Sequence, residues 1–165
     1  MSKKEDIDAQ DFRDAMSSLG AAVHIITTTG ETERCGITAS AVCAVTDDPP
    51  TLLVCLNRKS SINGAMKANG VLCVNTLAAG HEDVSGDFAG VTNKSSEERF
   101  AGQEWSELTT GAPVLKSSLV SFDCEITDIK EVGTHSVIFC AVRAVQHGSG
   151  ETGLIYYKRA YGTFT

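Results

Sequence analysis

The sequence lacks the excess of basic residues expected of a protein that binds nucleic acid. Acidic residues outnumber basic ones by 21 to 14, which gives a formal net charge of −7. Nucleic-acid binders gather lysine and arginine on one face, and a pair such as Lys158-Arg159 is too small to form such a face. We therefore expect no nucleic-acid partner.

Long hydrophobic runs are also missing. No stretch approaches 18 uninterrupted apolar residues, and the opening MSKKEDID contains no apolar export signal. We expect no membrane segment and a cytoplasmic location. The 165 residues show no linker and no shift in composition, so residues 1–165 are predicted to form a single domain with its own core.

Metal and disulfide patterns are absent as well. The six cysteines contain no Cys-x-x-Cys pair and lie in apolar runs, at Cys35, Cys43, Cys55, Cys73, Cys124 and Cys140. The four histidines show no ligand spacing. We interpret the cysteines as small, reduced core residues and expect no metal site.

One nucleotide-binding pattern is present, but in the wrong context. Residues 148–153, GSGETG, match G-x-G-x-x-G, whereas no P-loop and no G-x-S-x-G motif occurs. The dinucleotide fingerprint requires a helix directly after it. Here the strand-like residues 154–157, LIYY, follow, so we predict a hairpin turn.

Four short helices are predicted. The first contains apolar residues at helical spacing, namely Phe12, Ala15, Met16 and Leu19. Asp8 or Asp11 can cap it, and Gly20 is placed to end it. The others span residues 61–69 and 82–88, and a turn that starts at the capping box of Ser95 and Glu98.

Seven strands are predicted between clusters of glycine, proline, aspartate and serine, at residues 22–28, 35–45, 51–56, 71–76, 119–129, 136–145 and 154–157. They do not alternate with helices of ten or more residues, which disfavours a doubly wound parallel sheet. A mainly β fold, with mostly antiparallel strands closed into a barrel, fits the pattern better.

Residues 36–61 carry the strongest indication of a ligand. Two strands are joined at Pro49-Pro50, and the small residues 38–41 would let a flat ligand approach the backbone. Residues 58–61, Arg-Lys-Ser-Ser, combine cations and hydroxyls near a predicted helix start, which suits a phosphate. We expect residues 38–41 and 57–61 to line one continuous pocket. Ser60 or Ser61 could instead act only as a helix cap.

These segments together resemble a known family. The resemblance rests on residues 12–28, 36–61, 72–80 (LCVNTLAAG), 88–90 (FAG), 98–100 (ERF), 132–135 (VGTH) and 153–161 (GLIYYKRAY). In this order they are similar to the short-chain flavin reductases, which include reductase components of two-component flavin-dependent monooxygenases such as 4-hydroxyphenylacetate 3-monooxygenase.

The resemblance implies a split β-barrel of the FMN-binding type, with a few short helices, that forms a homodimer. Such a protein binds FMN or FAD, reduces it with NADH or NADPH, and supplies the reduced flavin to a partner monooxygenase. Hydride transfer between two cofactors needs positioning and no protein acid, base or nucleophile. We therefore expect no catalytic side chain in the strict sense.

The resemblance also implies a set of site residues. Those expected at the flavin are Gly36, Thr38, Ala39, Ser40, Ala41, Cys55, Leu56, Asn57, Asn75, Leu77, Phe88, Ala89 and Gly90, with Arg58, Ser60, Ser61 and Arg99 near its phosphate. Those expected on the NAD(P)H side are His135 and Tyr161.

Some of these residues have simpler interpretations. Phe88 fits a core position, Arg99 a surface ion pair, and His135 the edge of a strand. For the whole chain, two alternatives stay open, namely a flavin- or haem-binding split barrel without reductase activity and a barrel that binds another small ligand. The sequence leaves open FMN or FAD, NADH or NADPH, and the identity of the partner oxygenase.

Overall fold

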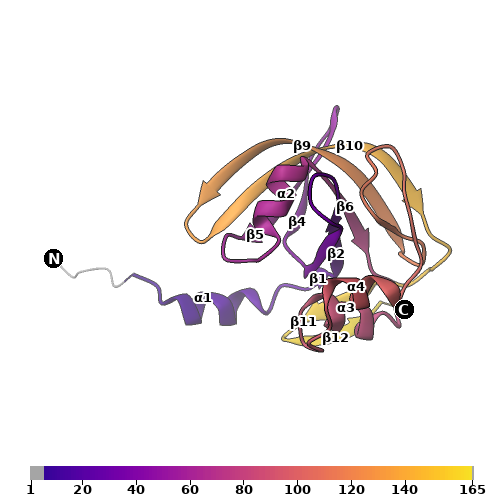
Figure 1. Ribbon diagram of the computed structural model, residues 1–165. Helices are drawn as coiled ribbons and strands as arrows, with labels where there is room; N and C mark the ends of the chain where they lie inside the picture. Colours follow the sequence, from indigo (N-terminus) through magenta and orange to yellow (C-terminus); the bar gives the residue numbers. More distant parts are fainter. Residues whose placement is uncertain (1–5, 165) are drawn as a thin grey trace.

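A strongly curved antiparallel sheet dominates the computed structural model, which describes residues 6–164 (Figure 1). Its seven strands lie in the order β3-β2-β6-β9-β10-β5-β4. Their bounds are β2 (His24–Thr28), β3 (Cys35–Ala39), β4 (Val42–Asp47), β5 (Pro50–Asn57), β6 (Val71–Thr76), β9 (Val120–Val132) and β10 (His135–His147). The mainly β, antiparallel fold predicted from the sequence is confirmed.

The two edge strands of this sheet follow one another in the chain. The single strand predicted over 35–45 is two strands, β3 and β4, separated only by Ser40 and Ala41. The two edges of the sheet therefore meet at residues 40 and 41. The barrel is open between the edges because β3 and β4 do not pair with each other. The predicted connection at Pro49-Pro50 is confirmed, since Asp47 of β4 pairs with Pro50 of β5.

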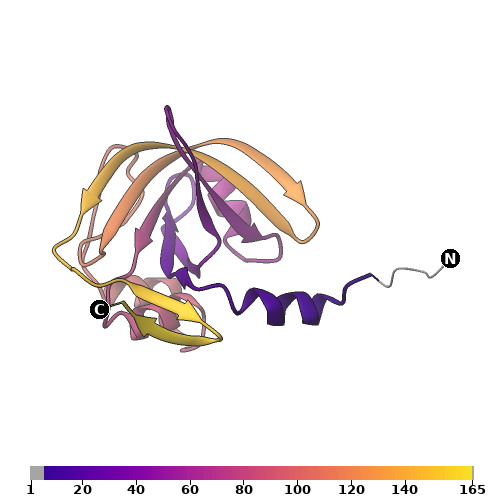
Figure 2. The same ribbon diagram turned by 180° about the vertical axis from the view of Figure 1, so that it is seen from behind.

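A smaller sheet lies beneath the barrel (Figure 2). It has the order β1-β11-β12 and consists of β1 (Ala21–Ala22), β11 (Leu154–Tyr157) and β12 (Ala160–Thr163). The predicted strand over 22–28 is divided between the two sheets at Val23, whose N–H donates to the carbonyl of Leu154 at 3.1 Å. Strand β12 and the short pair β7 (Trp105–Ser106) and β8 (Val114–Leu115) were not predicted.

Residues 148–153 connect the two sheets. They join β10 to β11, which do not pair, so the prediction of a hairpin turn is wrong. A strand and not a helix follows, as expected for a chance match to the dinucleotide fingerprint. Gly148 lies so close to the carbonyl oxygen of Ser118 that an added Cβ would be 1.9 Å away. This glycine therefore permits a close approach of two backbones.

Four helices complete the fold of residues 6–164. Helix α1 (Ala9–Met16) is capped by Asp8, ends before Gly20, buries no residue and projects from the body of the molecule (Figure 2). Helix α2 (Asn63–Asn69) starts later than predicted and ends at Gly70 with φ of 70°. Helices α3 (Glu82–Phe88) and α4 (Ser96–Ala101) agree with prediction, including the capping box of Ser95 and Glu98.

Two large apolar clusters and a small third one, of Cys73, Ala112 and Val114, form the core of the described residues. One of the large clusters fills the barrel and includes Ile26, Val54 and Leu72, whereas the other lies under α3 and α4 and includes Ile25 and Phe88. Neighbouring residues of β2 thus serve opposite faces, as strand geometry requires. No helix in the described part of the chain is long and apolar enough to cross a membrane.

The cysteines follow the core only in part. Cys73, Cys124 and Cys140 are buried, and Cys35 and Cys55 are half-buried. Cys43 is exposed on the edge strand β4, so the prediction of a core position is wrong for this residue. All six are free thiols. Within residues 6–164 no group of three metal-ligating side chains comes together.

Candidate functional site

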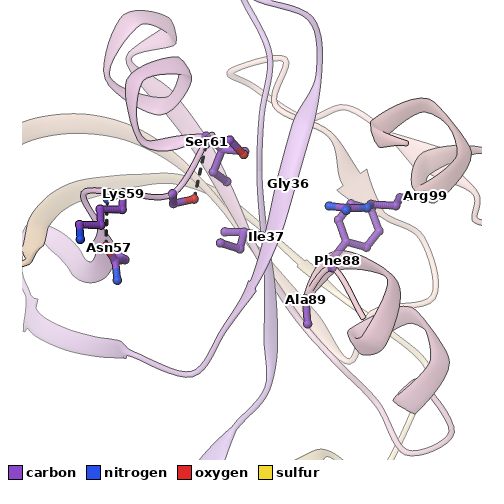
Figure 3. A pocket seen from close by; sticks show the side chains of 11 residues that line it. Gly36, Ile37, Asn57, Lys59, Ser61, Phe88, Ala89 and Arg99 are labelled. Atoms are coloured by element: carbon purple, nitrogen blue, oxygen red, sulfur yellow. Dashed lines mark hydrogen bonds between the residues drawn. The ribbon is translucent and has the colours of Figure 1, made fainter. Parts of the chain in front are cut away.

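A pocket of about 390 Å³ opens beside the outer edge of β3 (Figure 3). The loop after β5 forms one wall, and α3 with α4 forms the other. The lining residues are Gly36, Ile37, Asn57, Lys59, Ser60, Ser61, Ile62, Phe88, Ala89, Gly90 and Arg99. Because β3 is an edge strand, alternate backbone N–H and C=O groups along it have no partner strand.

The loop wall carries the polar groups. The side-chain oxygen of Asn57 accepts a hydrogen bond from the backbone N–H of Lys59 at 2.9 Å. The backbone carbonyl of Asn57 accepts one from the backbone N–H of Ser60 at 3.0 Å. These bonds fix a tight turn that presents Lys59, Ser60 and Ser61 to the pocket. Lys59 is a pocket residue that the candidate set omitted, although the Arg-Lys-Ser-Ser run contained it.

The alternative role of the serines as helix caps is wrong. The N-cap of α2 is Ile62, and no side chain caps that helix. The Ser60 hydroxyl accepts only a long hydrogen bond from the N–H of Ile62, at 3.4 Å. Ser60 and Ser61 thus precede the helix and line the pocket.

Arg58 departs from the expectation. Its Nε lies 3.0 Å from a carboxylate oxygen of Glu131, and its Nη1 donates to the carbonyl of Gly133 at 3.2 Å. These bonds direct the side chain toward the hairpin between β9 and β10. Arg58 is not among the residues that line the pocket, so its expected contact with a phosphate is not supported.

The helical wall is apolar with one cation. Phe88 is 2% exposed and packs edge-on against Phe100 at 5.2 Å between ring centroids, so it is both a core residue and a pocket wall. Arg99 lines the pocket, and its Nε donates to the carbonyl of Lys94 at 3.0 Å. Among residues 6–164, Arg99 is in none of the ion pairs, which disfavours the surface-pair interpretation.

A second pocket, of about 270 Å³, lies farther along the same strand edge. Its lining residues are Val23, Thr38, Ala39, Ser40, Ser85, Ala89, Val91, Tyr156 and Tyr161. Thr38 donates its hydroxyl to the carbonyl of Ser85 at 2.6 Å, and the Ser85 hydroxyl lies 2.8 Å from that of Tyr161. The pocket thus combines aromatic surface with one pair of bonded hydroxyls, those of Ser85 and Tyr161.

The expectation of one continuous pocket needs correction. Residues 38–40 line the second pocket and residues 57 and 59–61 line the first. The two pockets share Ala89 and follow one another along β3, with Gly36 and Ile37 in the first. Ala41 lines neither of them, because the chain turns away from this edge into β4.

Three candidate residues are core residues. Asn75 and Leu77 are 0% exposed, and Leu56 is 3% exposed within the barrel cluster. The Asn75 amide donates to the carbonyl of Ile25 at 3.1 Å, and its oxygen accepts from the N–H of Leu115 at 2.8 Å. Their side chains therefore have no access to a ligand in either pocket. Cys55, on the same strand as Leu56, is half-buried and lines neither pocket.

The two residues expected on the NAD(P)H side lie at different places. His135 begins β10 directly opposite Asn57 of β5, which brings it beside the first pocket. Its Nδ1 lies 2.8 Å from the Thr134 hydroxyl, and the residue is exposed. Tyr161 lies in the second pocket.

Comparison with known proteins agrees with this architecture. Residues 16–165 match the family model described as a flavin reductase like domain. The chain is 57% identical over 155 residues to "FMN reductase (NADH) RutF" of Ancylobacter novellus, covering 94% of this chain and 84% of the relative. It is 53% identical over 155 residues to the protein of the same name from Escherichia coli, covering 94% and 93%.

A solved structure is similar over the whole domain. A putative flavin reductase from Haemophilus somnus superposes with a TM-score of 0.91 at 46% identity, over 96% of this chain and 100% of that one. The resemblance read from the sequence motifs is thereby confirmed. The chain belongs to the flavin reductase-like domain family.

Proposed function

We propose that this protein is a flavin reductase that transfers hydride from NADH to FMN. The observation that carries the proposal is the ordered polarity of the two pockets along the edge of β3. Cationic and hydroxyl groups of Lys59, Ser61 and Arg99 lie at one end, and tyrosine rings lie at the other. A flavin nucleotide has the same order, from phosphate through ribityl chain to aromatic ring.

The fit assigns each part of FMN to a part of the strand edge. The phosphate would be held by Lys59, Ser60 and Ser61, since charged hydrogen bonds to phosphate are the strongest available here. The ring would lie near Thr38–Ser40, where small residues let it approach the backbone. Gly36 to Ser40 spans roughly 13 Å in an extended strand, which suits a ligand of this length.

The choice of FMN and NADH rests on the relatives. Proteins named FMN reductase (NADH) are 52–57% identical to this chain over nearly its whole length. We therefore place FMN and NADH ahead of FAD and NADPH.

The protein's own contribution to the reaction is positioning. The bound flavin and NADH supply the redox chemistry. The edge of β3 would hold the flavin ring and the loop at 57–61 its phosphate, and His135, which pairs with Asn57, would contact NADH at the border of the first pocket. Holding both reactants in near-attack geometry lowers the entropic part of the activation free energy for hydride transfer. No proton donor or acceptor is required.

A partner monooxygenase is the proposed consumer of reduced flavin. A solved homologue of nitrilotriacetate monooxygenase component B, from Mycobacterium thermoresistibile, is 28% identical with a TM-score of 0.85, over 94% of this chain and 86% of that one. Both pockets lie at the surface beside an edge strand, which favours a flavin that can leave. We propose that this chain delivers reduced FMN to an oxygenase.

We also propose a homodimer. Helix α1 buries none of its residues in this chain, and Phe12, Met16 and Leu19 are 53%, 45% and 58% exposed. An amphipathic helix with its apolar stripe in water favours burial against another copy.

Six free thiols and the use of NADH are consistent with a reducing, cytoplasmic environment.

Steady-state oxidation of NADH tests the proposal. Purified protein with FMN is expected to oxidise NADH, more slowly with NADPH, and to release reduced flavin that a trapping oxygenase can use. Bound flavin without NADH oxidation would instead support the alternative of a flavin-binding barrel without reductase activity. Absence of flavin binding would support a barrel for another small ligand.

A further inference from the structure

Arg58 ties the pocket loop to the tip of the β9–β10 hairpin. Its backbone N–H donates to the carbonyl of Thr134 at 2.9 Å, and its Nη1 donates to the carbonyl of Gly133 at 3.2 Å. Its Nε lies 3.0 Å from Glu131. Three groups of one residue thus bind Gly133 and Thr134 of the turn and Glu131 near the end of β9.

Glu131 also contacts helix α2 and strand β10. Besides Arg58, its carboxylate pairs with Lys67 of α2 and accepts the Ser136 hydroxyl of β10 at 2.9 Å. Asn63 of α2 donates to the same Ser136 hydroxyl at 3.1 Å. The pocket loop, α2 and the hairpin are therefore linked through one polar network.

The turn held by Arg58 carries His135. Gly133 has a φ of 54°, which only a glycine adopts without strain, and Thr134 follows it with its hydroxyl 2.8 Å from His135 Nδ1. His135 pairs with Asn57 across the sheet, and Asn57 lines the first pocket. A shift of this turn would move His135 relative to the pocket.

We propose that Arg58 is a positioning residue, which fixes His135 at the edge of the first pocket by its bonds to Glu131 and Gly133. The inference rests on the proposed function. It departs from the phosphate role that the sequence indicated, because the side chain is committed to the hairpin. It predicts that loss of Arg58 weakens the use of NADH and leaves the binding of FMN unchanged.

Arg58→Ala separates the two roles. The KM for NADH is expected to rise about fivefold to twentyfold, while the Kd for FMN, measured by flavin fluorescence, stays within about twofold. The Arg58 and Glu131 side chains are 54% and 39% exposed, and exposed pairs contribute little to stability. The melting temperature should therefore stay near that of the wild type. Glu131→Gln, which removes the charge and keeps the shape, should give the same pattern more weakly.

Arg143→Ala is the matched control. Arg143 of β10 pairs with Glu125 of β9 at 2.9 Å, and their side chains are 47% and 53% exposed. This variant should leave both constants unchanged. Lys59→Ala should give the opposite pattern, with weaker FMN binding and an unchanged KM for NADH.

A double-mutant cycle decides whether Arg58 acts through His135. If it does, Arg58→Ala should have no further effect in a His135→Ala background. Independent effects that multiply would overturn the proposal, and so would an Arg58→Ala variant that binds FMN less tightly but riboflavin equally well. If wild type and Arg143→Ala both fail to oxidise NADH, the proposed function fails. If both are active and Arg58→Ala matches them, only this inference fails.

Discussion

The backbone of Gly36 lies against the ring of Phe88. A Cβ added to Gly36 would lie 3.0 Å from Cε1 of that ring and 3.2 Å from the carbonyl oxygen of Ile26. Phe88 is itself 2% exposed among Phe100 and Trp105. Strand β3 and the helical wall of the first pocket are thus in direct contact at this point. Any side chain at Gly36 must displace either the strand or the Phe88 ring.

Gly36→Val should therefore damage both the fold and the pocket. Overpacking in a tight core costs about 1–3 kcal/mol, and a displaced Phe88 would narrow the pocket. We expect a lower free energy of unfolding in urea and weaker binding of both FMN and riboflavin. Gly64→Ala is the control, because nothing lies within 4 Å of a Cβ there. Unchanged stability and binding in Gly36→Val would contradict the packing described.

Lys59 and Ser61 are predicted to recognise the phosphate of FMN. Hydrogen bonds to charged groups contribute about 1.5–3 kcal/mol, so Lys59→Ala should weaken FMN binding by about tenfold or more. Riboflavin, which has no phosphate, should bind as it does to the wild type. Ser61→Ala should give a smaller effect of the same kind.

Lys116→Ala serves as the control for charge alone. Lys116 pairs with exposed Glu104 at 3.5 Å and lines neither of the two pockets described above. Fluorescence titrations with both flavins distinguish the cases. An equal loss for FMN and riboflavin in Lys59→Ala would place the phosphate elsewhere.

Asn75 is predicted to stabilise the fold without touching the flavin. Its amide bonds to Ile25 and Thr27, and its oxygen accepts from Leu115 and from the Ser121 hydroxyl at 2.8 Å. Asn75→Ala leaves several buried groups unpaired, at about 1–3 kcal/mol for each. Urea unfolding should show a large loss of stability, with an FMN Kd near that of the wild type in the folded fraction. Normal stability with weak FMN binding would restore the contact implied by the family resemblance.

His24 predicts how stability depends on pH. Burial lowers the pKa of this residue to about 4, and its Nδ1 lies 3.0 Å from the Thr76 hydroxyl. The unfolded chain protonates it near its ordinary pKa of about 6.5. Its contribution is thus fully present above about pH 6.5 and is lost as pH falls toward 4, to a total of about 3 kcal/mol.

Urea unfolding of wild type and His24→Asn tests this dependence. Between about pH 7.5 and 4.5 the wild type should lose more stability than the variant, which has no group to protonate at this position. The difference between the two proteins removes the contribution of other groups, including His81, whose pKa burial also lowers. Parallel curves would contradict the assignment.

Local patterns predicted much of the fold because they act through neighbouring residues. The capping box at Ser95 and the small-residue strand at 35–39 follow from rules that involve a few adjacent positions. The division of the predicted strand at Val23 does not follow from such local rules. It depends on hydrogen bonds with Leu154 and Leu77, which lie far away in the chain. Strand β12 was missed for a local reason, because it follows β11 through a two-residue turn at Lys158 and Arg159, which have positive φ although neither is a typical turn residue.

The site shows the same limit at the level of single side chains. The Arg-Lys-Ser-Ser run indicated a phosphate site, but the sequence does not show that Arg58 pairs with Glu131 while Lys59 lines the pocket. Family motifs marked Asn75 and Leu77, and the structure buries both. The region of the site is therefore visible in local sequence, whereas partners far away in the chain decide which of its residues face a ligand.

Anaerobic single-turnover reduction tests the central claim most directly. Protein loaded with FMN is mixed with one equivalent of NADH, and the flavin and nicotinamide absorbances are followed together. We expect the oxidised flavin band and the NADH band to disappear at one rate, which Arg58→Ala lowers and Arg143→Ala leaves unchanged when NADH is below saturation. Bound FMN that stays oxidised while NADH is stable would contradict the account.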